Sequence, residues 1–223
     1  MYKIITDFAR PDPALVQRAA QTFFAVTGGE AGPRQVMDAG IKPLLREWRI
    51  CGPAFTVRPE YTDDLTVGYA AGHLVKPGDV VVVDAGGRTD VACWGATMAR
   101  GVREGGAVGI VLDGVCLTSE TIIEREDIPV FCRGTVARSG DTTRPGWLNC
   151  PVICGGVIVN PGDIICGDAD GIVVLPRERA EAIIAVSEQA GSRSRAGATS
   201  GIPFRQRNKT LDKLKAMKGV VIE

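Results

Sequence analysis

The sequence predicts a single α/β domain, and three observations support that class. First, 223 residues with 45% hydrophobic and 23% charged residues are ordinary globular composition, enough for one sizeable core. Second, the apolar runs at residues 80–83 and 107–112 flank a helical segment, as in a strand–helix–strand unit with parallel strands. Third, a Pro-Gly-Asp turn occurs at residues 77–79 and 161–163, each time before an apolar strand. No linker precedes residue 176, so we expect one domain over residues 1–223.

In the first half of the chain, local patterns predict two helices and the beginning of the sheet. Asp12 is a suitable N-cap for the first helix, and Gly52-Pro53 interrupts the first strand. Glycines at residues 28–33 favour a loop. The predicted elements are a helix at 14–24, a strand at 49–57, a helix at 67–74 and a central strand at 80–83.

The second half is richer in strands. The helical pattern of residues 92–104 ends at Gly105-Gly106, a typical C-cap sequence. Residues 191–201 are rich in glycine, serine and arginine. The predicted elements are strands at 107–112, 130–132, 152–154, 156–159, 164–166 and 172–175, and helices at 177–189 and 210–217.

Charge and cysteine content exclude several classes of function. The 26 basic residues balance the 26 acidic ones, so no overall field favours nucleic acid or an anionic membrane surface. Seven cysteines without CxxC spacing, together with one histidine, argue against a structural zinc site and favour a reducing cytoplasm. No segment has the apolar length of a membrane helix. We therefore expect a cytoplasmic protein that binds neither nucleic acid nor membrane.

Two motifs follow the predicted parallel strands, at the sheet edge where a site is expected. The first is the loop at residues 84–90, which contains Gly86 and Gly87 and leads to the first turn of the next helix. Free amides in that turn suit a carboxylate or phosphate, although a tight connection alone would also require glycine. The second is Asp113-Gly114, where the aspartate could bind a metal, act as a base, or simply form a turn. Neither GxGxxG nor a Walker lysine is present, so a nucleotide is not indicated.

Five segments, in order along nearly the whole chain, resemble the RraA-like and 4-hydroxy-4-methyl-2-oxoglutarate (HMG/CHA) aldolase family. The resemblance implies a swivelling β/β/α layered fold that assembles as a homotrimer or a dimer of trimers (hexamer), with sites between subunits. The C-terminal residues 177–223, locally basic at Arg193, Arg195, Arg205 and Arg207, would then pack on a neighbouring subunit. The segments are Gly52-Pro53-Ala54-Phe55-Thr56-Val57, Lys76-Pro77-Gly78-Asp79-Val80, the run from Gly106 to Gly114, Pro129-Val130-Phe131-Cys132-Arg133-Gly134, and the run from Pro161 to Pro176.

The resemblance also shows where this sequence departs from the family. Catalytic members follow the Asp-Gly with two variable residues and then an Arg-Asp pair, in which the arginine binds a 2-oxo acid and the aspartate holds Mg²⁺. Here these positions are Leu117 and Thr118, and a further acidic position is Ala96. Mg²⁺ is thus implied by the resemblance alone, and the residues themselves indicate no cofactor and no metal ligand. The backbone amides of residues 95–98 would remain as a carboxylate pocket.

Other polar residues could replace the missing groups, although each is also an ordinary candidate for a solvated surface charge. A thiol at Cys93 or Cys116 is a further alternative, as a nucleophile activated by Arg88. The predicted catalytic residues are Arg88, Asp90, Asp113 and Glu120. The predicted substrate-binding residues are Gly86, Gly87, Gly95, Ala96, Thr97, Met98, Leu117, Thr118 and Arg133.

These features lead to three hypotheses about function. The first is a lyase of the aldolase or decarboxylase type that acts on a small 2-oxo or 2-hydroxy dicarboxylic acid through a rewired site. The second is a regulator that binds a ribonuclease without chemistry, because the family also contains such proteins. The third is a new isomerase or ring-opening activity on the same scaffold.

Overall fold

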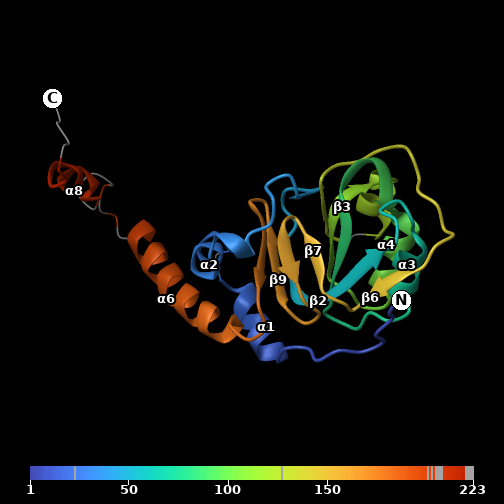
Figure 1. Ribbon diagram of the computed structural model, residues 1–223. Coiled ribbons are helices and arrows are strands. Elements are labelled where there is room, and N and C mark those ends of the chain that lie inside the picture. The colour runs from blue at the N-terminus through green and yellow to red at the C-terminus, as the bar shows by residue number, and fades with distance from the viewer. Residues whose placement is uncertain (23, 127, 200, 202, 204–207, 219–223) are drawn as a thin grey trace.

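The computed structural model describes residues 1–22, 24–126, 128–199, 201, 203 and 208–218 (Figure 1). Within them, the main sheet has the strand order β1-β5-β4-β3-β2-β9-β10, with β6 paired to β2 and a separate β7–β8 hairpin. The strands are β1 Lys42–Pro43, β2 Ile50–Pro59, β3 Val80–Trp94, β4 Gly109–Cys116, β5 Val130–Cys132, β6 Gly146–Leu148, β7 Val152–Cys154, β8 Val157–Val159, β9 Ile164–Asp168 and β10 Gly171–Leu175. The helices are α1 Pro13–Ala20, α2 Phe24–Ala31, the 3-10 turn η1 Pro33–Gln35, α3 Thr66–Ala71, α4 Ala96–Glu104, α5 Ser119–Thr121, the π-helical turn η2 Ile122–Glu126, α6 Ala180–Thr199 and α8 Thr210–Lys215.

The main sheet curves until its two ends meet, so that it forms a nearly closed barrel. Strands β2, β3, β4 and β5 run parallel, whereas β9 is antiparallel to both β2 and β10. Strand β2 makes the corner, because its first residues pair with β9 and residues from Ala54 onward pair with β3. At the far ends, Lys42 Nζ on β1 donates to the carbonyl of Asp170, beside β10, at 2.6 Å. This arrangement confirms the predicted α/β single-domain class.

Side-chain alternation along the parallel strands divides the core in two. On β3, Val81 and Val83 pack in the cluster that α3 and α4 cover, while Val80 and Val82 face the barrel interior. A third cluster joins α1, α2 and the start of α6 to β9 and β10. Figure 1 shows these two sets of helices on different sides of the strands, with α6 running outward from the body. None of the described helices is long and apolar enough to cross a membrane.

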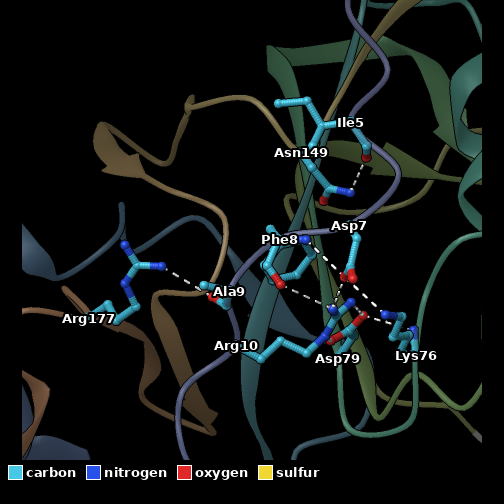
Figure 2. Close-up of polar contacts among 9 residues, drawn as sticks. All are labelled: Ile5, Asp7, Phe8, Ala9, Arg10, Lys76, Asp79, Asn149 and Arg177. Carbon is cyan, nitrogen blue, oxygen red and sulfur yellow. Dashed lines mark hydrogen bonds and ion pairs between the residues drawn. The ribbon is translucent and has the colours of Figure 1, made fainter.

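The N-terminal segment, residues 3–10, lies against the body although it is almost entirely irregular (Figure 2). Arg10 makes a bidentate ion pair with Asp79, with Nε–Oδ1 at 2.8 Å and Nη2–Oδ2 at 2.7 Å, and the Asp79 side chain is completely buried. Asp79 also accepts the amide of Lys76 at 2.9 Å. Nearby, Lys76 Nζ contacts Asp7 at 2.9 Å, and Arg177 donates to the carbonyl of Ala9 at 3.2 Å. The segment is thus fixed to the first Pro-Gly-Asp turn.

Several sequence predictions need correction. The first helix ends at Ala20, not at residue 24, and residues 84–90 lie within β3 instead of forming a loop after it. Residues 28–31 belong to helix α2, not to a loop. This helix packs closely on β10, where a Cβ at Gly28 would be 3.2 Å from Val173. Residues 92–94 continue β3, since Ala92 and Trp94 pair with β4, and the helix begins only at Ala96. The C-terminal helix is shifted, starting at residue 180 and continuing to residue 199. Arg205 and Arg207 lie outside the described residues.

Candidate functional site

The loops that follow β3, β4 and β5 come together at the carboxyl edge of the parallel strands. There the first turn of α4 faces the segment after β4, because Leu117 N donates to the carbonyl of Trp94 at 3.0 Å. Residues 95–98 and residues 117–118 therefore line one small pocket, together with Leu65, Tyr69 and Ser139. Its volume is about 110 Å³, roughly the share of three or four liquid waters at ~30 Å³ each.

Thr118 acts as the cap of α4 from outside the helix. Its Oγ1 accepts the amide of Ala96 at 2.9 Å and donates to the carbonyl of Leu117 at 2.6 Å. The backbone of Thr118 is left-handed, with φ of 55°, which is uncommon for a β-branched residue. The hydroxyl therefore occupies the Ala96 amide, one of the amides of the predicted carboxylate pocket, whereas the amides of Thr97 and Met98 belong to a helix turn that has no intrahelical acceptors for them.

The small pocket shares Leu117 and Thr118 with a second, more open pocket of about 440 Å³. The second pocket is lined by residues 117–121 and 135–137, so that it includes Glu120 on α5. Glu120 and Thr118 are both exposed. Of the four predicted catalytic residues, Glu120 is the one that the structure places beside the predicted carboxylate pocket.

Asp113 and Arg133 meet in a second, tightly bonded network. Arg133 Nε donates to Asp113 Oδ1 at 2.6 Å and Nη1 donates to Asp38 Oδ1 at 2.8 Å, while Gly155 N donates to Asp113 Oδ2 at 2.8 Å. Burial alone would lower the pKa of Arg133, but the two carboxylates raise it overall. Gly87 lies against the pair, since a Cβ there would be 3.7 Å from Arg133 Nε. Asp113, only 6% exposed, is thus engaged at both carboxylate oxygens.

Arg88 and Asp90 form a third group on the irregular part of β3. Arg88 binds Asp90 through Nε at 2.6 Å and Asp63 through Nη1 at 3.1 Å. The hydrogen bond with Arg88 lowers the pKa of Asp90 and raises that of Arg88, so each group stays charged. Gly86, with φ of 65°, turns the chain before them. Neither charged side chain lines the two pockets described above.

The alternative of a cysteine nucleophile finds no support at this edge. Cys93 is 4% exposed, its thiol points at the carbonyl of Val115, and burial raises its pKa to about 12. Cys116 is completely buried. A thiol that stays protonated is a poor nucleophile.

The residues at position 118 and around it do not fit Mg²⁺. Mg²⁺ prefers carboxylate oxygens in octahedral geometry, but Thr118 Oγ1 is already bonded to Ala96 N and to Leu117 O. In the part of the chain that the structure describes, no three His, Cys, Asp or Glu side chains are grouped to hold a metal ion.

Sequence reasoning missed several residues of these groups. Asp38 and Gly155 bind the Arg133–Asp113 pair from loops far away in sequence, and Asp63 binds Arg88. Among Asp38, Gly155 and Asp63, a turn pattern in the sequence marks Asp38, whose Oδ1 accepts the amide of Gly40 at 2.8 Å. Such turns are common, so the pattern alone does not indicate a site.

Comparison with known proteins identifies the family. A sequence profile described as RraA-like, Aldolase/RraA, matches residues 26–174, which is more than half of the chain. The chain belongs to the RraA-like family. A relative from Halalkalibacterium halodurans, provisionally named 4-hydroxy-4-methyl-2-oxoglutarate aldolase, is 37% identical over 166 residues, covering 74% of this chain and 78% of its own.

Solved structures of RraA-like proteins share the fold. Streptomyces coelicolor RraAS2, described as an unusual member of the RNase ES inhibitor RraA family, matches with a TM-score of 0.75 and 29% identity, covering 86% of this chain and all of its own. The RNA-processing inhibitor RraA from Thermus thermophilis matches with a TM-score of 0.57 and 26% identity, covering 63% of this chain and 84% of its own. RraA-like relatives thus carry names from two classes of function, aldolase and ribonuclease inhibitor.

Proposed function

We propose that this RraA-like protein is a carbon–carbon lyase that cleaves a small 2-oxo-4-hydroxy dicarboxylic acid or decarboxylates a 2-oxo dicarboxylic acid. The observation that carries the proposal is the pocket between the first turn of α4 and Thr118, which shares Leu117 and Thr118 with the neighbouring pocket that Glu120 lines. A relative that is 37% identical and named as an aldolase supports the same class. The proposed site is a rewired one, because Leu117 and Thr118 stand where catalytic relatives carry Arg-Asp.

In this proposal the amides of Thr97 and Met98 receive the substrate carboxylate. The N-terminus of a helix favours negative charge, and its first amides lack intrahelical partners. Leu117 packs against Gly95, where a Cβ would lie 3.1 Å from the leucine side chain, so the floor of the pocket is apolar and narrow. A narrow floor favours the unbranched 2-oxo acid end of the substrate over the branched end that carries the 4-hydroxyl.

Glu120 serves as the general base. It removes the proton of the substrate 4-hydroxyl, the bond between C3 and C4 breaks, and its electron pair passes into an enolate of the 2-oxo acid product. The helix N-terminus stabilises the enolate charge, and the enolate then takes a proton at C3. Arg133 and Asp113 position the loops after β5 and β4 through their ion pair, and do not take part in proton transfer.

The test is a steady-state assay of pyruvate release from 4-hydroxy-4-methyl-2-oxoglutarate and from oxaloacetate, each with and without Mg²⁺. We expect turnover of at least one substrate, and a loss of about 10²-fold or more in kcat for Glu120→Gln. Glu124→Gln is the matched control, since Glu124 is also exposed but lies outside both pockets. No turnover of either acid, together with no binding of oxalate or pyruvate by calorimetry, would refute the proposal.

A regulator of a ribonuclease is the second candidate, and one observation favours it. The guanidinium groups of Arg88 and Arg133 are both committed to carboxylates, and Thr118 covers an amide of the anion pocket. This site therefore has less free charge than a lyase site usually offers. Inhibition of purified ribonuclease E at stoichiometric ratio, in the absence of lyase turnover, would decide for the regulator. Turnover without inhibition would decide against it.

We further propose that the protein acts as a cytoplasmic homo-oligomer, a trimer or a dimer of trimers, with residues 177–223 against a neighbouring subunit. Helix α6 supports this, because in Figure 1 it runs outward from the body after its first turns. Sedimentation equilibrium of the full chain and of a chain ending at residue 190 tests the role of this arm. If both chains form oligomers with the same number of subunits, residues 191–223 do not hold the subunits together.

A further inference from the structure

Two cysteines face each other across the seam where β2 pairs with β9. The antiparallel register places Cys51 directly opposite Cys166, and their Sγ atoms are 3.7 Å apart. Directly opposed residues in such a pair have Cβ atoms about 4.5–5.5 Å apart, and a disulfide requires about 3.5–4.5 Å. Side-chain rotation and a small approach of the strands therefore suffice to form the bond.

The two thiols differ in access to solvent. Cys51 is half-buried, and its thiol also lies 3.5 Å from the carbonyl of Val16 on α1. Cys166 is completely buried in the core cluster under α1 and α6. A partly exposed thiol that can react first, next to a protected thiol that can resolve the product, is the arrangement found in redox-responsive cysteine pairs.

The chain contains a second pair that serves as an internal comparison. Cys116 on β4 and Cys132 on β5 have their Sγ atoms 4.0 Å apart, but they are 0% and 3% exposed. This pair has a similar sulfur separation, but both of its cysteines are buried. If the two pairs react differently with peroxide, the cause is therefore solvent access to the thiols or the pairing of the strands, not the sulfur distance alone.

We propose that Cys51 and Cys166 form a reversible disulfide when the protein meets hydrogen peroxide. The Cys51 thiolate attacks one peroxide oxygen, the O–O bond breaks, and the departing hydroxide takes up a proton to leave as water. Cys51 becomes a sulfenic acid. The hydrogen bond with Cys51 and burial raise the pKa of the Cys166 thiol, but this thiol lies directly against the Cys51 sulfur. Cys166 attacks that sulfur as its proton passes to the departing hydroxide, and the S–O bond breaks in the same step. Two thiols and one peroxide thus give one disulfide and two waters.

The bond would have a mechanical effect on the fold. It joins residues 115 positions apart in the sequence, and a cross-link over so long a loop restricts the unfolded chain strongly. It also withdraws the thiol hydrogen bond from Val16 on α1. We expect the oxidised protein to unfold at a temperature several degrees higher than the reduced protein.

The experiment uses the full chain, first reduced and then treated with hydrogen peroxide. Remaining thiols are alkylated in denaturant, and the peptides are mapped by mass spectrometry without reduction. The expected result is a peptide that joins Cys51 to Cys166, lighter than the sum of its parts by two hydrogen atoms and lost on treatment with dithiothreitol. Cys116 and Cys132 should remain free and alkylated in the same sample.

Variants separate this bond from general oxidation. Cys51→Ser and Cys166→Ser should each abolish the thermal shift between oxidised and reduced protein, whereas Cys116→Ser should retain it. The proposal is overturned if Cys51 and Cys166 both remain alkylatable after peroxide, or if Cys51 proceeds to sulfinic acid without a cross-link. Because the wild-type map decides the question by itself, a variant that fails to fold does not remove the test.

Discussion

Replacement of Arg10 by alanine should destabilise the fold far more than the replacement of an equally well-bonded surface arginine. Arg10 is the bidentate partner of the completely buried Asp79. Removing one partner of a buried pair costs about 3–5 kcal/mol. The Arg10 side chain is 19% exposed and Asp79 keeps the amide of Lys76, so water and this amide offset part of the loss. We expect a loss of about 2–3 kcal/mol of stability, which corresponds to a fall in Tm of roughly 4–12 °C for a domain of this size.

Arg18 provides the matched control. It also binds two carboxylates, Glu181 at 2.6 Å and Glu188 at 3.0 Å, but the Arg18 side chain is 39% exposed and the two glutamate side chains are 67% and 42% exposed. Exposed pairs contribute little to stability, so Arg18→Ala should change the urea midpoint only slightly. Arg10→Lys retains the charge but not the bidentate geometry, so its urea midpoint should lie between those of Arg10→Ala and Arg18→Ala. Equal midpoints for Arg10→Ala and Arg18→Ala, measured by circular dichroism at constant m-value, would refute the reasoning.

Three further predictions follow from single contacts. Thr118→Ala removes the hydroxyl that accepts the Ala96 amide and should lower the free energy of unfolding by about 1 kcal/mol. Because the Ala96 amide is then free, calorimetry should show tighter binding of oxalate. Weaker binding would contradict the pocket assignment. Burial would raise the pKa of Asp64, but hydrogen bonds from backbone amides lower it overall. The stability that ionised Asp64 contributes is thus present above pH ~4 and is lost as the pH falls through the lowered pKa of Asp64. The difference in free energy of unfolding between wild type and Asp64→Ala should therefore become smaller in acid. A difference that does not change with pH would exclude this linkage. Gly140→Ala should unfold or strongly destabilise the protein in thermal melts, because the new Cβ would lie 1.9 Å from the carbonyl of Asp63, whereas a wild-type Tm would show that the loop can move freely.

The central strands could be predicted from sequence because their signal is local. Residues 80–83 and 109–112 are buried on both faces, so they appear as continuous apolar runs bounded by turns. The end of β3 could not be predicted in the same way. Ala92 pairs with β4 after two register shifts and Trp94 after a third, and this pairing depends on contacts across the sheet. The same limit applies to α2, where glycine permits close packing on β10.

The candidate site was predictable in its position but not in its bonding. Parallel topology alone brings Asp113 and Arg133 to one edge, and the structure places their side chains in contact. That Asp38 and Gly155 complete the network depends on loops distant in sequence. At position 118 the family resemblance predicts the loss of an acid, and only the geometry shows a hydroxyl acting as a helix cap.

The attachment of residues 3–10 has a consequence for how the molecule opens. This segment lacks regular structure for most of its length, yet it forms backbone hydrogen bonds with Leu148. Its Arg10 pairs with the buried Asp79, and its Ala9 carbonyl accepts a hydrogen bond from Arg177, just before α6 (Figure 2). Release of the N-terminus therefore exposes the buried carboxylate of Asp79 and removes the hydrogen bond of Arg177, which precedes α6, at the same time. Amide hydrogens such as that of Ile5 should exchange with solvent as slowly as those of the barrel strands, so that an apparently loose tail unfolds only together with the whole domain.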